Sequence, residues 1–173
     1  GETVQAGQRL ATLTAGAGQE TLAQTPAEIL DTVDVNAKSP LAHIYQQHSN
    51  TLDHHRQEAV AKRHSKGYRS ARENLQDLCD ENSFVEYGQL AVAAQRGRKS
   101  LDALRSETAA DGVITGLATI NHSLFGPVAS QVAVVINDYT VLAGTQGYFH
   151  HKKIDRILEQ AKRHSLPVIM YTE

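Results

Sequence analysis

Two apolar runs stand out in the C-terminal third of the chain. Residues 112–120, GVITGLATI, and residues 131–137, QVAVVIN, are short and rich in β-branched side chains, a composition typical of strands. The segment NHSLFGP lies between them and predicts a hairpin connection, because glycine and proline interrupt regular structure. We therefore expect two neighbouring strands here.

An amphipathic helix and a third apolar run follow. After a glycine-containing turn, apolar side chains recur at the helical spacing i, i+3, i+4 and i+7. These residues are Ile154, Ile157, Leu158 and Ala161. The run LPVIMY then predicts a strand that is buried on both faces, with Met170 in the core. The order strand–strand–helix–strand predicts a mixed α/β fold with a covered sheet.

The segments before these strands are more polar. Residues 40–64 predict a helix in two pieces, with Leu41, Ile44 and Tyr45 on one face. A basic glycine turn follows, and then a short helix with leucines on its apolar side and a short strand over residues 83–88. Residues 93–110 are polar and basic, so we expect an exposed, mobile loop there.

The N-terminal segment differs in composition from the rest. Residues 1–13, GETVQAGQRLATL, predict a turn followed by a strand. Residues 14–38 are rich in Ala, Gly, Thr and Gln, which is typical of a flexible linker, with a short helical patch over 26–30.

Composition narrows the function classes. A chain of 173 residues can bury the core of one ordinary domain. The formal net charge of -2 argues against a nucleic-acid binder that relies on bulk charge, and we expect neither a membrane span nor a signal peptide. The single cysteine, Cys79, cannot form an internal disulfide, which fits a reducing compartment. Because the chain begins with glycine, we expect a piece of a longer protein.

Three separated motifs resemble one known family. DGVITGLATI, NDYTVLAGTQGYFHHKKI and AKRHSLPVI are similar, in order and spacing, to the carboxyltransferase domain of biotin-dependent acyl-CoA carboxylases. That family typically shows D-G-V-V-T-G-x-G-x-I, then D-F-T-V-x-G-G-S-x-G-x-x-H-x-x-K-I, then a PVI strand. The matching positions are Asp111, Gly112, Val113, Thr115, Gly116, Ile120, Asp138, Thr140, Val141, Gly144, Gly147, His150, Lys153, Ile154, Pro167, Val168 and Ile169.

Two further stretches extend the resemblance. KGYRSARENLQDLCDENSFVEYG fits the same family's G-K-x-T-A-R-E-R-I-x-x-L-L-D-x-x-S-F-x-E, so the resemblance covers roughly residues 55–173. Residues 1–13 are similar to the last hairpin of a biotinyl or lipoyl carrier domain. Together these imply a carrier tail over 1–13, a flexible linker over 14–38, and the truncated first part of a carboxyltransferase N-terminal half over 39–173.

The resemblance implies a crotonase-like fold of repeated ββα turns and an oxyanion hole made of two backbone N–H groups. One of them is expected at Ala143 or Gly144, where small residues let a thioester approach the backbone. The alternative is a plain strand-to-helix turn. The second N–H is expected from a Gly-Gly pair beyond Glu173, the biotinyl lysine before Gly1 and the carboxybiotin pocket in a later half. The fragment alone is therefore predicted to be inactive.

A basic cluster offers a site for coenzyme A. Lys66, Arg69 and Arg72 could meet its phosphates, and the resemblance adds Thr145 and Gly147 of the turn as substrate-binding residues. The alternative is an ordinary solvated basic face.

Other polar residues have structural interpretations. His150 and Lys153 share a helix side, which favours packing or hydrogen bonding at the helix terminus. Cys79 is expected to be half-buried and inert, and His54, His55 and His64 do not have zinc-site spacing.

The sequence also departs from the family pattern. The usual Gly-Gly-Ser is Ala143-Gly144-Thr145, and the usual tight hairpin is lengthened to NHSLFGPVAS. Arg69 stands near a position where the family tends to have Leu or Thr. The first change is mild if backbone amides act, whereas the second could reshape one wall of the site.

The functional hypothesis is a fragment of a multidomain carboxylase that moves CO2 from carboxybiotin to the α-carbon of an acyl-CoA. The resemblance implies biotin as cofactor, an acyl-CoA as substrate, biotin carboxylase and carrier domains in the same chain, and a homodimer in the cytoplasm or mitochondrial matrix. Two alternatives remain open: a non-catalytic interaction or scaffold module, and another crotonase-type hydratase or decarboxylase acting on acyl-CoA.

Overall fold

The computed structural model describes residues 39–172. The expected carrier tail over 1–13 and the expected linker over 14–38, with its helical patch, lie outside the described residues.

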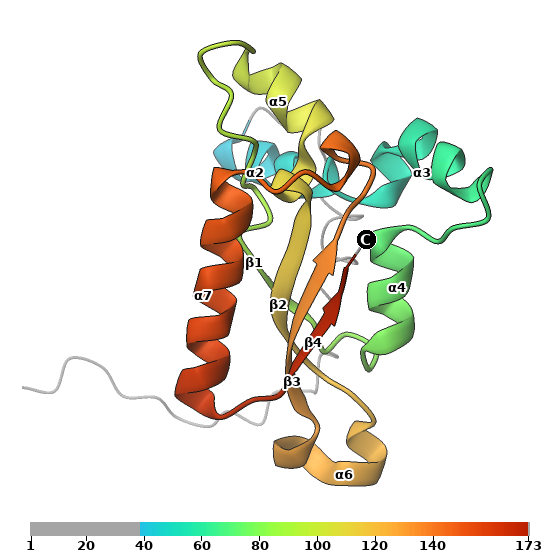
Figure 1. The fold of residues 1–173 in the computed structure, drawn as a ribbon, viewed down its shortest axis with the longest axis vertical. Coiled ribbons are helices and arrows are strands. Elements are labelled where there is room, and N and C mark those ends of the chain that lie inside the picture. The colour runs from blue at the N-terminus through green and yellow to red at the C-terminus, as the bar shows by residue number, and fades with distance from the viewer. Residues whose placement is uncertain (1–38, 173) are drawn as a thin grey trace, which may run out of the picture. The chain divides into compact units, whose positions relative to one another are not determined.

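A four-stranded mixed sheet in the order β1-β2-β3-β4 forms the centre of the described part (Figure 1). Its strands are β1 Val85–Tyr87, β2 Val113–Thr119, β3 Gln131–Asn137 and β4 Val168–Tyr171. The first three pair antiparallel, and β4 joins β3 in parallel, with Ala133 opposite Val168. The predicted mixed α/β class and the strand–strand–helix–strand order are confirmed.

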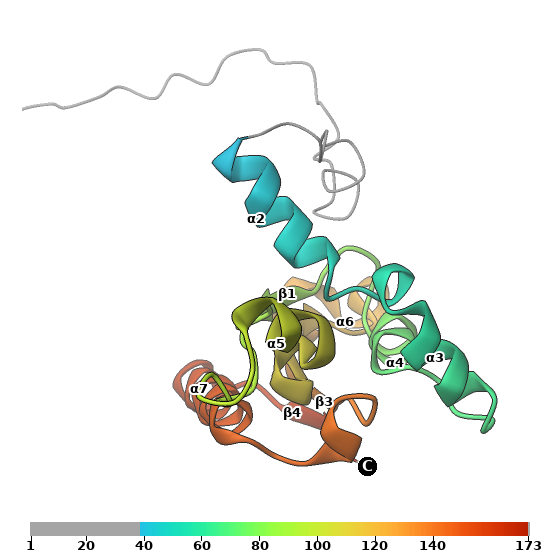
Figure 2. The same ribbon diagram turned by 90° about the horizontal axis from the view of Figure 1, so that it is seen from above.

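One helix covers each face of the sheet (Figures 1 and 2). On one face, Ile157 and Ala161 of α7 (Tyr148–His164) pack against buried residues of β2 and β3. On the other face, Leu75 of α4 (Ala71–Leu78) packs against Ile114 and further buried residues of the same strands. Because β2 and β3 are covered on both sides, they read as nearly continuous apolar runs. Leu158, expected on the buried side of α7, is 40% exposed.

Local hydrogen bonds fix where α4 begins. Ser70 accepts a hydrogen bond from the Glu73 backbone N–H, and the Glu73 carboxylate accepts one from the Ser70 N–H, which is a capping box. Hydrogen bonding with His64 lowers the pKa of the Glu73 carboxyl. The turn between α3 (Gln57–His64) and α4 is thereby held at both of its ends.

The N-terminal helical region is in pieces, as predicted. It comprises α2 (Pro40–Ser49), a 3-10 turn η1 (Asp53–His55) and α3 (Gln57–His64). The face that Leu41, Ile44 and Tyr45 share on α2 is not a buried one, because Leu41 is 60% exposed and Ile44 48% exposed. Ala42 is the buried position of that helix.

The region 93–110 is not the exposed loop that its polarity predicted. It contains α5 (Leu101–Glu107) and passes into the 3-10 turn η2 (Ala109–Gly112). Leu104 and Thr108 are fully buried, and the Thr108 hydroxyl both accepts from the Ala93 N–H and donates to the Leu104 carbonyl. A few buried anchors therefore hold a segment whose remaining side chains are largely solvated.

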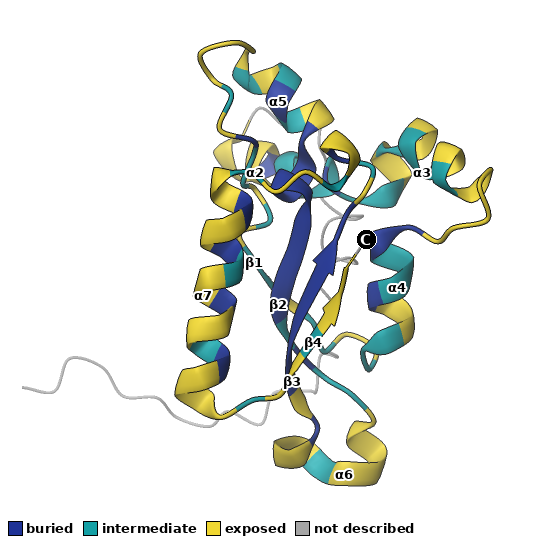
Figure 3. Cartoon of the chain, viewed as in Figure 1, coloured by how far each residue is buried: buried dark blue, intermediate teal, exposed yellow. Residues whose placement is uncertain are grey.

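Two expectations about strand β4 were also wrong. The strand was expected to be buried on both faces and Met170 to lie in the core, but Met170 is 45% exposed and Val168 is 40% exposed (Figure 3). Within the described residues β4 is an edge strand of the sheet, and α7 lies over β2 and β3 instead. The β2–β3 connection forms a short helix, α6 (His122–Ala129), with a non-helical residue at Gly126 before Pro127. No helix of the described part is long and apolar enough to cross a bilayer.

Candidate functional site

The turn after β3 has an unusual backbone conformation. Leu142, Ala143 and Gly144 all have positive φ angles, of 48°, 52° and 76°. The Gly144 N–H donates to the Val141 carbonyl oxygen at 3.0 Å. The N–H of Ala143 has no hydrogen-bond acceptor among the residues described, and Ala143 is exposed. Of the two predicted donors, the geometry therefore favours Ala143, because the Gly144 N–H already closes the turn.

The start of this turn is held by a buried ion pair. Arg56 Nη1 donates to Asp138 Oδ2 at 2.7 Å, and Arg56 Nη2 donates to Thr140 Oγ1 at 2.6 Å. The side chains of Arg56 and Asp138 are only 8% and 11% exposed. Three groups from two distant segments therefore form one closed polar cluster beside Ala143.

The other end of the turn leads into α7, whose N-terminus is held by Asp111. Asp111 Oδ2 accepts the His150 backbone N–H at 2.7 Å, and its carbonyl lies 3.0 Å from His150 Nδ1. A β-carbon on Gly147 would lie 3.3 Å from both carboxylate oxygens, so a side chain there would make the Asp111 carboxylate shift by a few tenths of an ångström.

Lys153 belongs to the same support. Its ammonium group donates to the carbonyls of Ala110 and Val113. Burial lowers the pKa of Lys153 to about 8 and also lowers the pKa of His150. The predicted structural role of His150 and Lys153 is confirmed.

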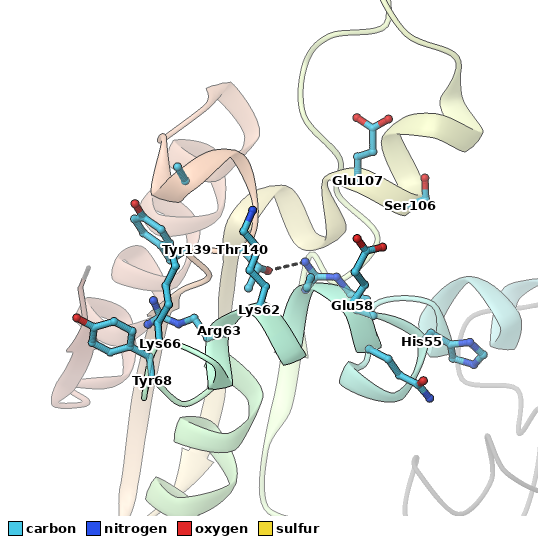
Figure 4. A pocket seen from close by; sticks show the side chains of 14 residues that line it. His55, Glu58, Lys62, Arg63, Lys66, Tyr68, Ser106, Glu107, Tyr139 and Thr140 are labelled. Carbon is cyan, nitrogen blue, oxygen red and sulfur yellow. Dashed lines mark hydrogen bonds between the residues drawn. The ribbon is translucent and has the colours of Figure 1, made fainter.

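A broad open pocket of about 1140 Å³ lies beside the turn (Figure 4). The lining comes from helix α3 with the residues on either side of it, from the end of α5 and from the β3–α7 turn. It comprises His55, Arg56, Gln57, Glu58, Ala59, Lys62, Arg63, Lys66, Tyr68, Ser106, Glu107, Tyr139, Thr140 and Ala143. The pocket thus brings together two of the predicted site residues, Ala143 and Lys66.

One side of the pocket is basic and aromatic. Lys62 lies in α3 and Lys66 in the turn that follows it. The Arg63 guanidinium carbon lies 4.8 Å from the centre of the Tyr68 ring and 5.5 Å from that of Tyr139. Glu58 and Glu107 also line the pocket (Figure 4). The arrangement can bind a large anion that carries a ring.

The other predicted substrate-binding residues do not line this pocket. Arg69 donates to Asp77 and to the Glu73 carbonyl. Arg72 forms a two-bond pair with Glu86, at 2.6 Å and 3.1 Å. Thr145 and Gly147 lie further along the turn, so coenzyme A contacts by all four residues stay predictions.

Sequence reasoning missed several residues of the pocket. Arg56, Lys62, Arg63, Tyr68 and Tyr139 were not singled out. The basic residues Lys62 and Arg63, a few positions before Lys66, were a usable signal, since they extend the predicted basic cluster into the predicted helix. Nothing local to Arg56 indicates that it meets residues 82 and 84 positions away.

The thiol and imidazole groups have ordinary surroundings. Burial raises the pKa of Cys79 to about 11, which leaves the thiol protonated at neutral pH and confirms its half-buried setting. His64 pairs with Glu73, and His54 lies 3.1 Å from the Ser49 hydroxyl. Among residues 39–172, no group of three His, Cys, Asp or Glu side chains could hold a metal ion.

Comparison with known families is decisive here, because residues 62–173 match the carboxyl transferase domain family. The chain belongs to this family. It is 33% identical over 147 residues to a propionyl-CoA carboxylase beta chain of Saccharopolyspora erythraea, covering 83% of this chain and 24% of that protein. It is also 33% identical over 113 residues to the methylmalonyl-CoA carboxyltransferase 12S subunit of Propionibacterium freudenreichii subsp. shermanii, covering 65% and 20%.

Solved structures agree with the family. A single-chain, multi-domain long-chain acyl-CoA carboxylase superposes with a TM-score of 0.76 and 51% identity, covering 78% of this chain and 13% of that one. A transcarboxylase 12S structure with hydrolysed methylmalonyl-CoA bound gives 0.62 and 28%, covering 77% and 25%. The predicted family is therefore confirmed, and the mixed α/β fold is that of carboxyltransferases. The chain spans about a quarter of the length of the first of these relatives.

Proposed function

We propose that this chain is part of a biotin-dependent acyl-CoA carboxylase and supplies one wall of its acyl-CoA site. The observation that carries the proposal is the Ala143 N–H, which has no acceptor among the described residues and lies at the edge of a basic and aromatic pocket. The same placement would not be needed in a turn that only connects a strand to a helix.

The proposed chemistry begins with the thioester. When the α-carbon of the acyl group loses a proton, negative charge develops on the thioester oxygen. A backbone N–H already aimed at that oxygen stabilises the enolate, and one such donor contributes several kcal/mol in known oxyanion holes, on the order of 3 kcal/mol. We assign this donor to Ala143. The second donor is expected outside the described residues.

The rest of coenzyme A would lie along the pocket. Lys62, Lys66 and Arg63 present positive charge for phosphates, and Tyr68 and Tyr139 present rings for the base. A transcarboxylase 12S, a relative of this chain, has been solved with methylmalonyl-CoA bound. The polar groups of the pocket fit an acyl-CoA of unspecified chain length.

Biotin is implied by the family, and its place in the protein is not argued from any described residue. Carried on a lysine, it would supply the carboxyl group that the enolate carbon attacks. The Ala143 N–H and the basic pocket fit the thioester and the phosphates, so we expect the biotin ring to be held elsewhere in the protein.

The same proposal includes the partners that the resemblance implies. A carrier tail over 1–13 and a linker over 14–38 would tether the biotinyl group near this site and raise its effective concentration. Biotin carboxylase and carrier domains in the same protein and a homodimer of transferase domains would complete the site. The chain by itself is expected to show no turnover, because it holds one donor of the two.

The test is a titration of the ¹⁵N-labelled chain by nuclear magnetic resonance. Propionyl-CoA is expected to shift the Ala143 amide proton downfield and to leave Gly144 much less affected. Free coenzyme A lacks the thioester carbonyl and is expected to shift pocket residues such as Tyr68 but not Ala143. If propionyl-CoA binds while the Ala143 amide stays unchanged, the turn is structural and the scaffold alternative is favoured.

A charge reversal tests the pocket separately. Lys66→Glu is expected to raise the Kd for coenzyme A about fivefold, the effect of roughly 1 kcal/mol at a solvated charge. Lys152→Glu makes the same charge change on α7, outside the pocket, and is the matched control. Equal effects of the two variants would show that only net charge matters.

A further inference from the structure

Arg56 lies before the segment that matches the carboxyl transferase family, yet it reaches the turn that carries Ala143. The family match begins at residue 62, and Arg56 is the residue that precedes the first turn of α3. Its side chain is 8% exposed although its residue lines the pocket. A guanidinium so enclosed has its terminal nitrogens occupied and offers little to a ligand phosphate.

The contacts of Arg56 form a closed set around two residues. Nη1 donates to Asp138 Oδ2 and Nη2 to Thr140 Oγ1. Thr140 in turn donates twice to Asp138 Oδ1, from its backbone N–H at 3.0 Å and from its hydroxyl at 2.5 Å. Because the bonds share partners, moving any one of these groups strains the others.

The backbone extends this rigidity to Ala143. The Asp138 N–H donates to the Gly112 carbonyl at 2.8 Å, and the Asp138 carbonyl accepts from the Val141 N–H at 3.1 Å. Val141 then accepts from Gly144, which encloses Ala143 between two turns. A left-handed residue costs about 1–2 kcal/mol outside glycine, so Leu142 and Ala143 require such external support to keep their conformation.

We propose that Arg56 is a positioning residue, which holds the β3–α7 turn in the left-handed conformation that points the Ala143 N–H into the pocket. The role of the turn in catalysis rests on the proposed function, but the effect of Arg56 on the turn does not. Arg56 acts through Asp138 and Thr140 and touches no reacting atom. The N-terminal helical region thereby becomes part of the site.

The experiment compares two buried arginine–carboxylate pairs of the full 173-residue chain. Arg72 and Glu86 are 11% and 9% exposed and joined at 2.6 Å, which matches the Arg56–Asp138 pair closely, but their hydrogen bonds to each other do not involve residues 138–147. The variants are Arg56→Lys and Arg56→Met, with Arg72→Lys and Arg72→Met as controls. The readout is the strong intraresidue nuclear Overhauser effect between H–N and Hα at Ala143, which reports a positive φ.

Both Arg56 variants are expected to lose this signature, because lysine cannot bond Asp138 and Thr140 at once in a planar fork. They are also expected to weaken propionyl-CoA binding by about fivefold, the fold-change from one lost neutral hydrogen bond. Both Arg72 variants are expected to keep the signature at Ala143. Arg56→Lys keeps the positive charge beside Asp138. It therefore still tests the positioning role if Arg56→Met does not fold.

Two results would overturn the positioning role. One is retention of the Ala143 signature in the Arg56 variants. The other is an equal loss in the Arg72 variants, which would make the effect a general consequence of removing a buried pair. A third result separates the two proposals. If Arg56→Lys loses the Ala143 signature that the wild-type chain shows, but propionyl-CoA does not shift the wild-type Ala143 amide, the positioning role stands and the proposed function fails.

Discussion

The two ends of β3 are connected in opposite ways (Figure 1). At its start, α6 exposes Leu124 by 75%, Phe125 by 61% and Val128 by 82%. At its end, the turn over 138–147 is fixed by buried polar contacts from Arg56 and from Asp111. Both connections leave the same buried strand, so burial of the strand does not decide how a connection is held. At the α6 end, Asp80 accepts the His122 N–H in an exposed contact. The buried side-chain hydrogen bonds from distant segments gather at the end that carries the candidate site.

Removing the Asp111 carboxylate should have the largest effect on this contrast. Asp111→Ala leaves the N-terminus of α7 uncapped and takes the negative charge away from buried Lys153. The expected loss in the free energy of unfolding is about 4 kcal/mol. Asp111→Asn keeps the acceptor oxygen and tolerates a positive φ, so it should lose about half as much. Urea denaturation of both variants measures the effect, and a loss below 1 kcal/mol for Asp111→Ala would contradict it.

Lys153 makes the same end depend on pH. Burial lowers its pKa from 10.5 in the unfolded chain to about 8 in the folded one. Between these values the unfolded chain binds more protons, so the stability of the folded protein rises as the pH rises from about 8 to 10.5. Relative to Lys153→Met, the wild type should gain up to about 3 kcal/mol over this window. Parallel pH profiles of the two proteins in urea would contradict the assignment.

Ala143 tests the backbone of the turn itself. Its φ of 52° disfavours any residue with a β-carbon, so Ala143→Gly should leave the fold intact and stabilise it by about 0.5–1 kcal/mol. Ala143→Val should destabilise it by a similar amount or more, because a β-branched side chain tolerates positive φ least. Thermal unfolding of the pair measures the difference. A turn that relaxes to negative φ would show no preference for glycine.

The α6 end should respond least. The triple variant Leu124→Ser, Phe125→Ser and Val128→Ser changes only exposed side chains, and its free energy of unfolding should stay within about 0.5 kcal/mol of the wild type. Binding of propionyl-CoA should also be unchanged, because α6 lies at the other end of β3 from the pocket. A loss of stability above 1 kcal/mol would mean that the apolar side chains of α6 pack in a way that their exposure does not show.

The contrast also explains which predictions from sequence succeeded. Strand β3 was predicted with its observed bounds, β2 nearly so, and α7 as an amphipathic helix, because a buried element carries its own apolar pattern. Helix α5 was missed since one fully buried leucine in seven residues gives no periodicity. The apolar run of β4 indicated a strand correctly but could not show what would cover it.

The candidate site was predicted only where a motif marked it. Ala143 and Lys66 came from local patterns and meet at one pocket. Arg56 could not be found in this way, because an arginine in a charged helical segment has many ordinary roles. Its importance arises from a contact with Asp138, which no local pattern contains.

The distance between Arg56 and Asp138 along the chain also has a consequence for folding. The two residues are 82 positions apart, and bringing such distant segments together requires closing a large loop. The sheet between β2 and β3 forms from residues much closer in sequence and can assemble first. The turn with Ala143 should therefore take its final shape after the strand beside it, so that the candidate site becomes ordered later than the sheet that carries it.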